Sequence, residues 1–475
     1  MASTRILRLA YLLSLLIAGL ATAQTPSPAP SPSPEAAPSP EGADDAELVG
    51  LLETYFKAKD LRTRREAQGK IAGYPEVTFD RVADALPKVK LWDQHPSGVE
   101  KVEVRMPHPG RGGSPTAVVQ VRVPAHYDPG HAYPLLLGIP DRGRDAEQFT
   151  GLLAMLASER RDRMIVAAVE GLEGVWFSDG QAAANDPLNL LDVLKRRYHL
   201  DTNRILLTGY GAGAHAAFSL GLLDPDAFAA VMPLAGACAL ETGAESADLF
   251  LPNLTNTPVF AVFGAEDLEK FHPEPGATVL GGVAGWNRYM AARAEHLDVP
   301  LRAFELPDAN TDGIVPDADV LTRFLDARRP AAPHQVALRF RYPEQGRIGW
   351  LRQTRFTGDP WTAQSIVISP GEKETPEEAI RAVLTEKLAF LGGSVAGQAV
   401  RIDTGRCDRI DVLLSDGLVD LGEDVTIHVD GTQRFAGRLE RRLGTLLEEA
   451  RRDWEFQRPV AARVQISKSG RAIEY

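Results

Sequence analysis

The chain has 475 residues, of which 44% are apolar and 24% are charged, and its formal net charge is −12 at pH 7. This length and this apolar content predict a globular protein of two or three domains. The acidic charge is spread along the sequence and no basic patch offsets it. Nucleic acid and anionic lipid are therefore excluded as expected partners.

The first 23 residues have the pattern of a secretory signal peptide. Arg5 and Arg8 precede an apolar run at 9–20, and an A-x-A cleavage site ends at Ala23. The run is shorter than the roughly 20 residues that a bilayer requires. We therefore expect a secreted or periplasmic protein with no transmembrane segment after cleavage. A single uncleaved membrane anchor is the alternative.

A linker and a helical segment are expected next. Residues 24–43 are rich in Pro, Ser, Ala and Glu, and a segment of this composition does not bury enough surface to fold. Between residues 44 and 97, apolar side chains recur at helical spacing, with breaks near Asp60 and Gly73. This pattern predicts two or three short helices that pack on the region that follows.

Strand and helix patterns alternate between residues 98 and 329, which predicts a mostly parallel sheet with helices on both faces. Eight strands are expected, at 102–106, 117–123, 133–139, 164–169, 204–208, 229–234, 259–263 and 301–306. Helices are expected at 146–160, 187–197, 212–223, 286–296 and 318–327.

Residues 330–475 have a different character, because period-two stretches dominate them. Strands are expected at 336–342, 366–368, 400–402, 410–414 and 425–429, and helices at 376–389 and 444–454. Asp430-Gly431 is a type I′ hairpin signal. We predict a separate β-rich domain here, either a sandwich or an open barrel. Cys238 and Cys407 fall in different domains, and we expect two buried free thiols, with a disulfide as the alternative.

Residues 207–214 contain the most informative motif of the chain. They read Leu-Thr-Gly-Tyr-Gly-Ala-Gly-Ala, between a short apolar strand and a helix of small residues. This is the context of a nucleophile elbow, Gly-x-Ser-x-Gly, with Gly211 in the position of the serine. Residues 185–220 resemble secreted esterases of the polyhydroxybutyrate depolymerase and feruloyl esterase type, and related prolyl-oligopeptidase-like domains. The resemblance covers roughly residues 98–329 and implies an α/β-hydrolase fold of eight strands.

The resemblance also implies where a Ser-His-Asp triad would lie. Asp267, in the Gly-x-x-Asp segment after the strand at 259–263, corresponds to the acid, and helix capping is its alternative role. Thr311 stands in the position of the histidine, and threonine is not a base at neutral pH. Gly211 has no side chain that could form an acyl intermediate. His215, in the first turn after the elbow, is expected to pack rather than to replace the base.

The loop after the strand at 133–139 departs from the family as well. It reads Pro140-Asp141 in place of the usual His-Gly, ahead of Arg142. A carboxylate there would oppose a developing oxyanion, by roughly 4 kcal/mol at a separation of 4 Å and an effective dielectric of 20. The sequence therefore predicts that serine-hydrolase activity is lost. It also predicts that the vacated cleft binds a ligand; its expected rim is Gly211, Asp267, Asp141, Arg142 and Trp176.

Residues 308–319 match the oxygen-ligand loop of calcium sites, D-x-[DN]-x-[DN]-G-x5-[DE]. Calcium needs hard oxygen ligands on alternating residues, a glycine at the bend and a closing carboxylate. The expected ligands are Asp308, Asn310, Asp312, the carbonyl of Ile314, and Asp319. An Asp-Gly loop followed by a capped helix is the alternative explanation of this spacing.

These features lead to three hypotheses. The first is an exported, catalytically inactive α/β-hydrolase-fold protein that binds a small-molecule or cell-envelope ligand. The second is an active ester or peptide hydrolase that uses an unrecognised nucleophile or a metal-bound water. The third is a cell-envelope interaction protein that works through its C-terminal domain.

Overall fold

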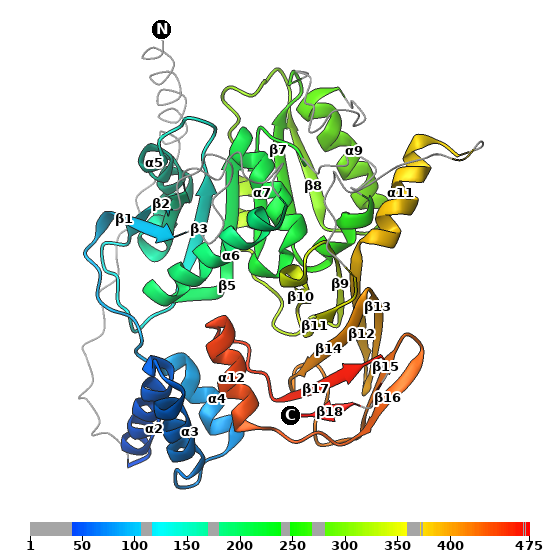
Figure 1. Cartoon of the computed structure of the whole chain (residues 1–475). Helices are drawn as coiled ribbons and strands as arrows, with labels where there is room; N and C mark the ends of the chain where they lie inside the picture. The colour runs from blue at the N-terminus through cyan, green and yellow to red at the C-terminus, as the bar shows by residue number, and fades with distance from the viewer. Residues whose placement is uncertain are drawn as a thin grey trace, which may run out of the picture. The chain divides into compact units, whose positions relative to one another are not determined.

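A computed structural model describes residues 40–105, 116–169, 180–238, 248–267, 281–358, 371, 374–468, 470 and 472–475 (Figure 1). The chain divides into two compact units, Met1–Glu47 and Leu48–Tyr475. Of the first unit, only 40–47 are described, and helix α2 (Pro40–Lys57) begins there, inside the predicted linker. The predicted signal peptide lies outside the described residues. Within the described ranges, no helix combines the length and the apolar character that crossing a membrane requires.

An eight-stranded sheet forms the centre of the second unit, in the order β1-β2-β4-β3-β5-β6-β7-β8. The strands are β1 (Gly98–Arg105), β2 (Thr116–Val123), β3 (Tyr133–Ile139), β4 (Ile165–Val169), β5 (Leu200–Tyr210), β6 (Ala230–Leu234), β7 (Val259–Gly264) and β8 (Leu301–Leu306). The pairs β1–β2 and β2–β4 are antiparallel, and the other pairs are parallel. An antiparallel edge followed by parallel crossovers, with β4 ahead of β3, is the strand order of the α/β-hydrolase fold. The predicted fold and its eight strands are confirmed.

Helices cover this sheet on both faces, which explains why its central strands β3, β4, β6 and β7 are buried at nearly every position. The helices of the first face are α6 (Gly180–Arg197), α7 (Ala212–Leu223) and α9 (Gly282–His296), and those of the second are α5 (Ala146–Ala157) and α10 (Ala318–Leu325). Along β3, Leu135 and Leu137 contribute to the first core, whereas Leu136 contributes to the second. Successive side chains of one strand point to opposite faces of the sheet and thus pack in two separate cores.

Two five-stranded sheets make up the C-terminal region, in the orders β10-β11-β14-β17-β18 and β16-β15-β13-β12-β9. Their strands are β9 (Gln335–Phe340), β10 (Arg347–Ile348), β11 (Leu351–Phe356), β12 (Ala389–Ala396), β13 (Ala399–Gly405), β14 (Cys407–Leu414), β15 (Val425–Val429), β16 (Thr432–Gly437), β17 (Ala462–Ser467) and β18 (Ile473–Glu474). Leu338 and Ile402 of one sheet share a buried core with Val412 and Val464 of the other. The region is therefore a sandwich and not an open barrel.

The turn at 430–431 and the first helix predicted in this region are both present. Asp430 and Gly431 have φ values of 49° and 74°, as a type I′ turn between β15 and β16 requires. Helix α11 (Pro376–Lys387) lies where a helix is predicted, whereas the strand predicted at 366–368 lies outside the described residues. Cys238 and Cys407 are both buried and form no disulfide with each other, and burial raises the pKa of the Cys407 thiol to about 12.

The N-terminal helices share a core with a helix from the other end of the chain. These are α2, α3 (Leu61–Ala72) and α4 (Phe79–Ala85), packed with α12 (Leu443–Asp453). Leu446 and Leu447 of α12 are fully buried in the same cluster as Leu52 and Phe56. Since Leu48–Tyr475 forms one compact unit, the domain boundaries at 97/98 and 329/330 stay a prediction.

Candidate functional site

The elbow is formed by a single residue, because β5 ends at Tyr210 and α7 begins at Ala212. Gly211 has φ 55° and ψ −118°, a backbone conformation that side chains rarely adopt. Neighbouring glycines permit close backbone packing: a Cβ on Gly209 would lie 2.1 Å from the carbonyl oxygen of Gly213. The alternating glycines therefore specify the sharp strand-to-helix turn even without a nucleophile at its centre.

The carboxylate of Asp141 occupies the place of the missing side chain. Its Oδ1 accepts hydrogen bonds from the backbone N–H groups of Arg142, at 2.8 Å, and Ala212, at 2.9 Å. A Cβ on Gly211 would lie 2.5 Å from this same oxygen. A serine cannot fit at position 211 while Asp141 keeps this conformation.

These two N–H groups are the ones that an α/β-hydrolase uses to bind an oxyanion, one from the residue after the nucleophile and one from the loop after the third strand. Hydrogen bonds to a carboxylate are short and strong, and the N-terminus of α7 favours the same negative charge. The sequence predicts that Asp141 repels an oxyanion from nearby. The structure instead places its carboxylate inside the hole, as an anion supplied by the chain itself.

The positions corresponding to the acid and the base of a triad are in contact. The Thr311 hydroxyl donates a hydrogen bond of 2.6 Å to Oδ2 of Asp267, which is 3% exposed at the end of β7. A Cβ on Gly264 would lie 2.1 Å from the carbonyl oxygen of Ala309, so the loop that carries Thr311 crosses directly over the end of β7. The roles given to Asp267 and Thr311 as former acid and base stay a prediction.

Tyr210 joins the elbow to the Thr311 loop, a role that the sequence analysis did not predict. Its hydroxyl donates to the carbonyl oxygen of Thr311, at 2.5 Å, and accepts from the N–H groups of Gly313 and Ile314, both at 3.1 Å. Burial raises the pKa of Tyr210, so the phenol stays neutral at pH 7. The elbow motif leaves this position unspecified, so no pattern marks the residue.

His215 lies in the first turns of α7 and is partly buried. Its Nδ1 is 2.7 Å from the carbonyl oxygen of Ala237 and 3.0 Å from the backbone nitrogen of the same residue. Burial lowers the pKa of His215 to about 4, against the opposing effect of the Asp141 charge. Such an imidazole is too weak a base to take a proton from a serine near neutral pH.

Arg142 and Trp176 are the remaining residues of the expected cleft rim, and neither is seen to contribute a side chain to the site. The side chain of Arg142 is exposed, and it is the backbone N–H of this residue that enters the site. Trp176 lies outside the described residues. The structure thus brings together Asp141, Gly211 and the Asp267–Thr311 pair.

The loop at 308–319 carries the predicted calcium ligands. Throughout the described ranges, no three acidic, histidine or cysteine side chains are placed to hold one ion. Asp319 is 90% exposed and lies 3.8 Å from Arg323, one turn further along α10, while Asn310 accepts from the N–H of Asp312 at 2.9 Å. An Asp-Gly loop followed by a helix remains the alternative explanation of this spacing. The calcium ligands Asp308, Asn310, Asp312, Ile314 and Asp319 stay a prediction.

A cavity of about 340 Å³ lies in a region that the sequence did not indicate, where α4 and α12 meet the sandwich. Its walls come from α4, from residues 331–333, 415–418 and 455–461, and from α12. No motif spans these segments, because they come together only in the folded chain.

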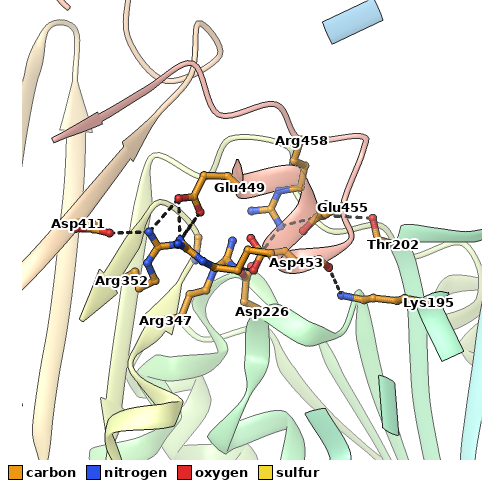
Figure 2. A network of polar contacts seen from close by, with 12 residues as sticks. Lys195, Thr202, Asp226, Arg347, Arg352, Asp411, Glu449, Asp453, Glu455 and Arg458 are labelled. Atoms are coloured by element: carbon orange, nitrogen blue, oxygen red, sulfur yellow. Dashed lines mark hydrogen bonds and ion pairs between the residues drawn. The ribbon is translucent and has the colours of Figure 1, made fainter. Parts of the chain in front are cut away.

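Several residues that line this cavity belong to a network of ion pairs (Figure 2). Arg352 contacts Glu449 at 2.6 and 3.0 Å and Asp411 at 2.6 Å. Arg347 pairs with Asp453 of α12. Although burial raises the pKa of Glu449, the adjacent Arg352 guanidinium holds it below its ordinary value.

A second group of ion pairs connects the segment after α12 to the α/β region (Figure 2). Glu455 pairs with Arg329 and accepts a hydrogen bond from Thr202 at the start of β5, at 3.2 Å. Arg458 lies 3.4 Å from Asp226. Despite burial, these arginines hold the pKa of Glu455 at about 2.

Comparisons with known proteins find only distant similarities to solved structures. No protein-family model matches the chain, and no curated protein matches it. Similar solved structures include a thermostable esterase, at 16% identity and a TM-score of 0.37, covering 49% of this chain and 63% of that one. They also include a putative dipeptidyl aminopeptidase IV from Bacteroides ovatus, at 14% identity and a TM-score of 0.35, covering 48% and 35%. A poly(aspartic acid) hydrolase from a Sphingomonas species has 14% identity and a TM-score of 0.37, with 48% and 97% covered.

The chain thus spans about two thirds or less of the first two of these proteins. Likeness at this level says nothing of the reaction. What this chain does has to be argued from its own residues.

Proposed function

We propose that this chain is an exported, non-hydrolytic protein built on the α/β-hydrolase fold, which acts by binding a ligand. One observation carries the proposal: the Asp141 carboxylate accepts from the N–H groups of Arg142 and Ala212 and fills the space where a serine side chain would start. A single side chain thus removes both the room for a nucleophile and the site for an oxyanion.

The neighbouring positions support this proposal. Thr311 donates to Asp267, as the N–H of a histidine would, but a hydroxyl does not take up the proton of a nucleophile. The low pKa of His215 removes the nearest substitute. The fold keeps the elbow but lacks a nucleophile and a base, and we therefore propose ligand binding as its function.

The proposal is tested by assaying the purified mature protein against panels of ester and peptide substrates, beside Asp267→Asn. We expect no turnover above that of a heat-denatured sample. Turnover that co-purifies with the protein would contradict the proposal and favour the hydrolase hypothesis. Its loss in Asp267→Asn would locate the reaction at this site.

A further inference from the structure

We infer that the cavity between α4, α12 and the sandwich binds a small organic cation. Its volume of about 340 Å³ falls within the range of small-molecule sites, which occur preferentially where separate parts of a fold meet. Thr202 near the start of β5 contacts Glu455, which lines the cavity, whereas Gly211 follows the end of the same strand. Nine residues of strand separate the two regions by about 30 Å, and the inference does not depend on the hydrolase-like site.

The inner wall of the cavity is rigid and already neutralised. Arg347 is paired with Asp453, and Glu449 with Arg352 (Figure 2). Trp350 donates its indole N–H to the carbonyl oxygen of Pro333 at 2.8 Å. Binding to a wall fixed in this way loses little side-chain entropy. The charge that selects a ligand must therefore come from elsewhere in the lining.

Asp80 and Asp84 supply that charge from the α4 side. They lie one turn apart on α4, both are exposed, and both line the cavity. Neither has a hydrogen bond or ion pair to another residue in the part of the chain that is described. The Arg441 guanidinium, whose pKa the Asp80 charge helps to raise, is itself paired with Asp416 at 2.5 Å. Like charges at this spacing repel each other, and a bound cation would relieve that repulsion.

The composition of the lining defines the class of ligand. Four of the six carboxylates that line the cavity are paired with arginines, so the uncompensated charge that favours a cation is that of Asp80 and Asp84. Because no three metal-ligating side chains converge anywhere in the described ranges, a bare metal ion has no coordination site. Phe79, which is partly exposed, adds aromatic surface that attracts ammonium groups and covers an apolar stem. A primary ammonium carried on an apolar body meets these requirements.

Calorimetric titration of the full mature chain with phenethylammonium tests this inference. Phenethyl alcohol and 3-phenylpropanoate serve as probes of similar shape with neutral and negative charge. We expect the ammonium to bind at least tenfold more tightly than the alcohol, and the carboxylate not to compete. In Asp80→Asn/Asp84→Asn, ammonium binding should weaken at least tenfold while the alcohol is unaffected and Tm is unchanged or higher.

The control is Glu386→Gln/Asp403→Asn, which removes the same charge from exposed positions outside the cavity. Its ammonium affinity should remain that of the parent chain. Three outcomes would overturn the inference: no binding of the ammonium, equal binding of the three probes, or equal weakening in the two double variants.

Discussion

At the scale of residues, Asp141 and Gly211 are complementary, because the carboxylate fills the volume that the glycine leaves open. The free energies of the two positions must therefore be coupled. Asp141→Ala leaves the N–H groups of Ala212 and Arg142 without their acceptor and should cost about 1 to 3 kcal/mol. Gly211→Ser introduces a contact of 2.5 Å with Asp141 and should cost at least as much.

A double-mutant cycle of Asp141→Ala and Gly211→Ser, followed by urea unfolding, measures this coupling. The double variant should be more stable than the sum of the two single changes predicts, by about 1 kcal/mol or more. Strict additivity would show that Asp141 does not occupy the serine position in solution.

Asp224, at the C-terminal end of α7, predicts an unusual dependence of stability on pH. Burial raises its pKa from 3.8 to about 7, and its Oδ2 has no hydrogen-bond partner among the described residues. Between these values the folded chain holds a proton that the unfolded chain has lost. The stabilising contribution is therefore complete below about pH 4 and is lost as the pH rises to about 7, by up to about 4 kcal/mol.

Thermal unfolding of the parent chain and Asp224→Asn at pH 5 and at pH 8 checks this sign. The variant should be the more stable of the two at pH 8, and its advantage should shrink at pH 5. A difference in unfolding free energy that does not change with pH would show that Asp224 does not titrate in this range.

At the scale of elements, the sequence predicted the α/β region well and the sandwich less well. The central strands of the α/β region are apolar and buried on both faces, which gives a strong signal, whereas β12 contains Gly392 and Gly393, which read as a turn. A Cβ on Gly393 would lie 2.4 Å from the Trp350 ring, so a glycine is needed there for packing across the sandwich. Such a need is set by a residue distant in sequence, and no local pattern reveals it.

The candidate site, too, could be predicted only in part from the sequence. Gly211, Asp267 and Thr311 could be located from their order relative to the strands. The position of the Asp141 carboxylate depends on contact with Ala212, 71 residues away, and could not be derived from local sequence. The cavity at α4 and α12 was missed because its walls come from five separate segments.

Helix α12 determines how the C-terminal region can be isolated. Leu446, Leu447 and Ala450 are buried against the N-terminal helices, so a fragment of residues 331–475 exposes an apolar face. We expect this fragment to aggregate or to bind hydrophobic dyes, and co-expression with residues 48–97 to reduce dye binding severalfold. Dye fluorescence and size-exclusion chromatography measure this effect. A monomeric fragment that binds no dye would contradict this assignment and restore the hypothesis of an autonomous C-terminal domain.

At the scale of the whole molecule, Glu455 connects the α/β region to the segment after α12. Glu455→Gln leaves Arg329, 8% exposed, without its counter-charge and should cost about 3 to 5 kcal/mol. Glu448→Gln, at a side chain 52% exposed on α12, should cost less than about 1 kcal/mol. Urea unfolding at pH 7 compares the two variants, and equal costs would contradict the importance of the buried pair.

The same carboxylate predicts a response to acid. Because its pKa is about 2 in the folded chain and near 4.5 when unfolded, its contribution is present above pH 4.5 and is lost as the pH falls toward 2. Acid unfolding of the parent chain should therefore be steeper than that of Glu455→Gln. The Glu455 contribution to stability is lost toward low pH, whereas that of Asp224 is lost toward high pH. Unfolding experiments across a pH series can therefore separate the two groups.

Labelling by a fluorophosphonate probe tests the central claim most directly, using three forms of the mature protein. The parent chain should not react, and neither should Gly211→Ser/Thr311→His, since Asp141 still fills the nucleophile position and the oxyanion hole. The triple variant Asp141→Gly/Gly211→Ser/Thr311→His should be labelled, because all three obstacles have been removed. Labelling of the parent chain, or of the double variant as fast as the triple, would contradict a site closed by the chain's own carboxylate.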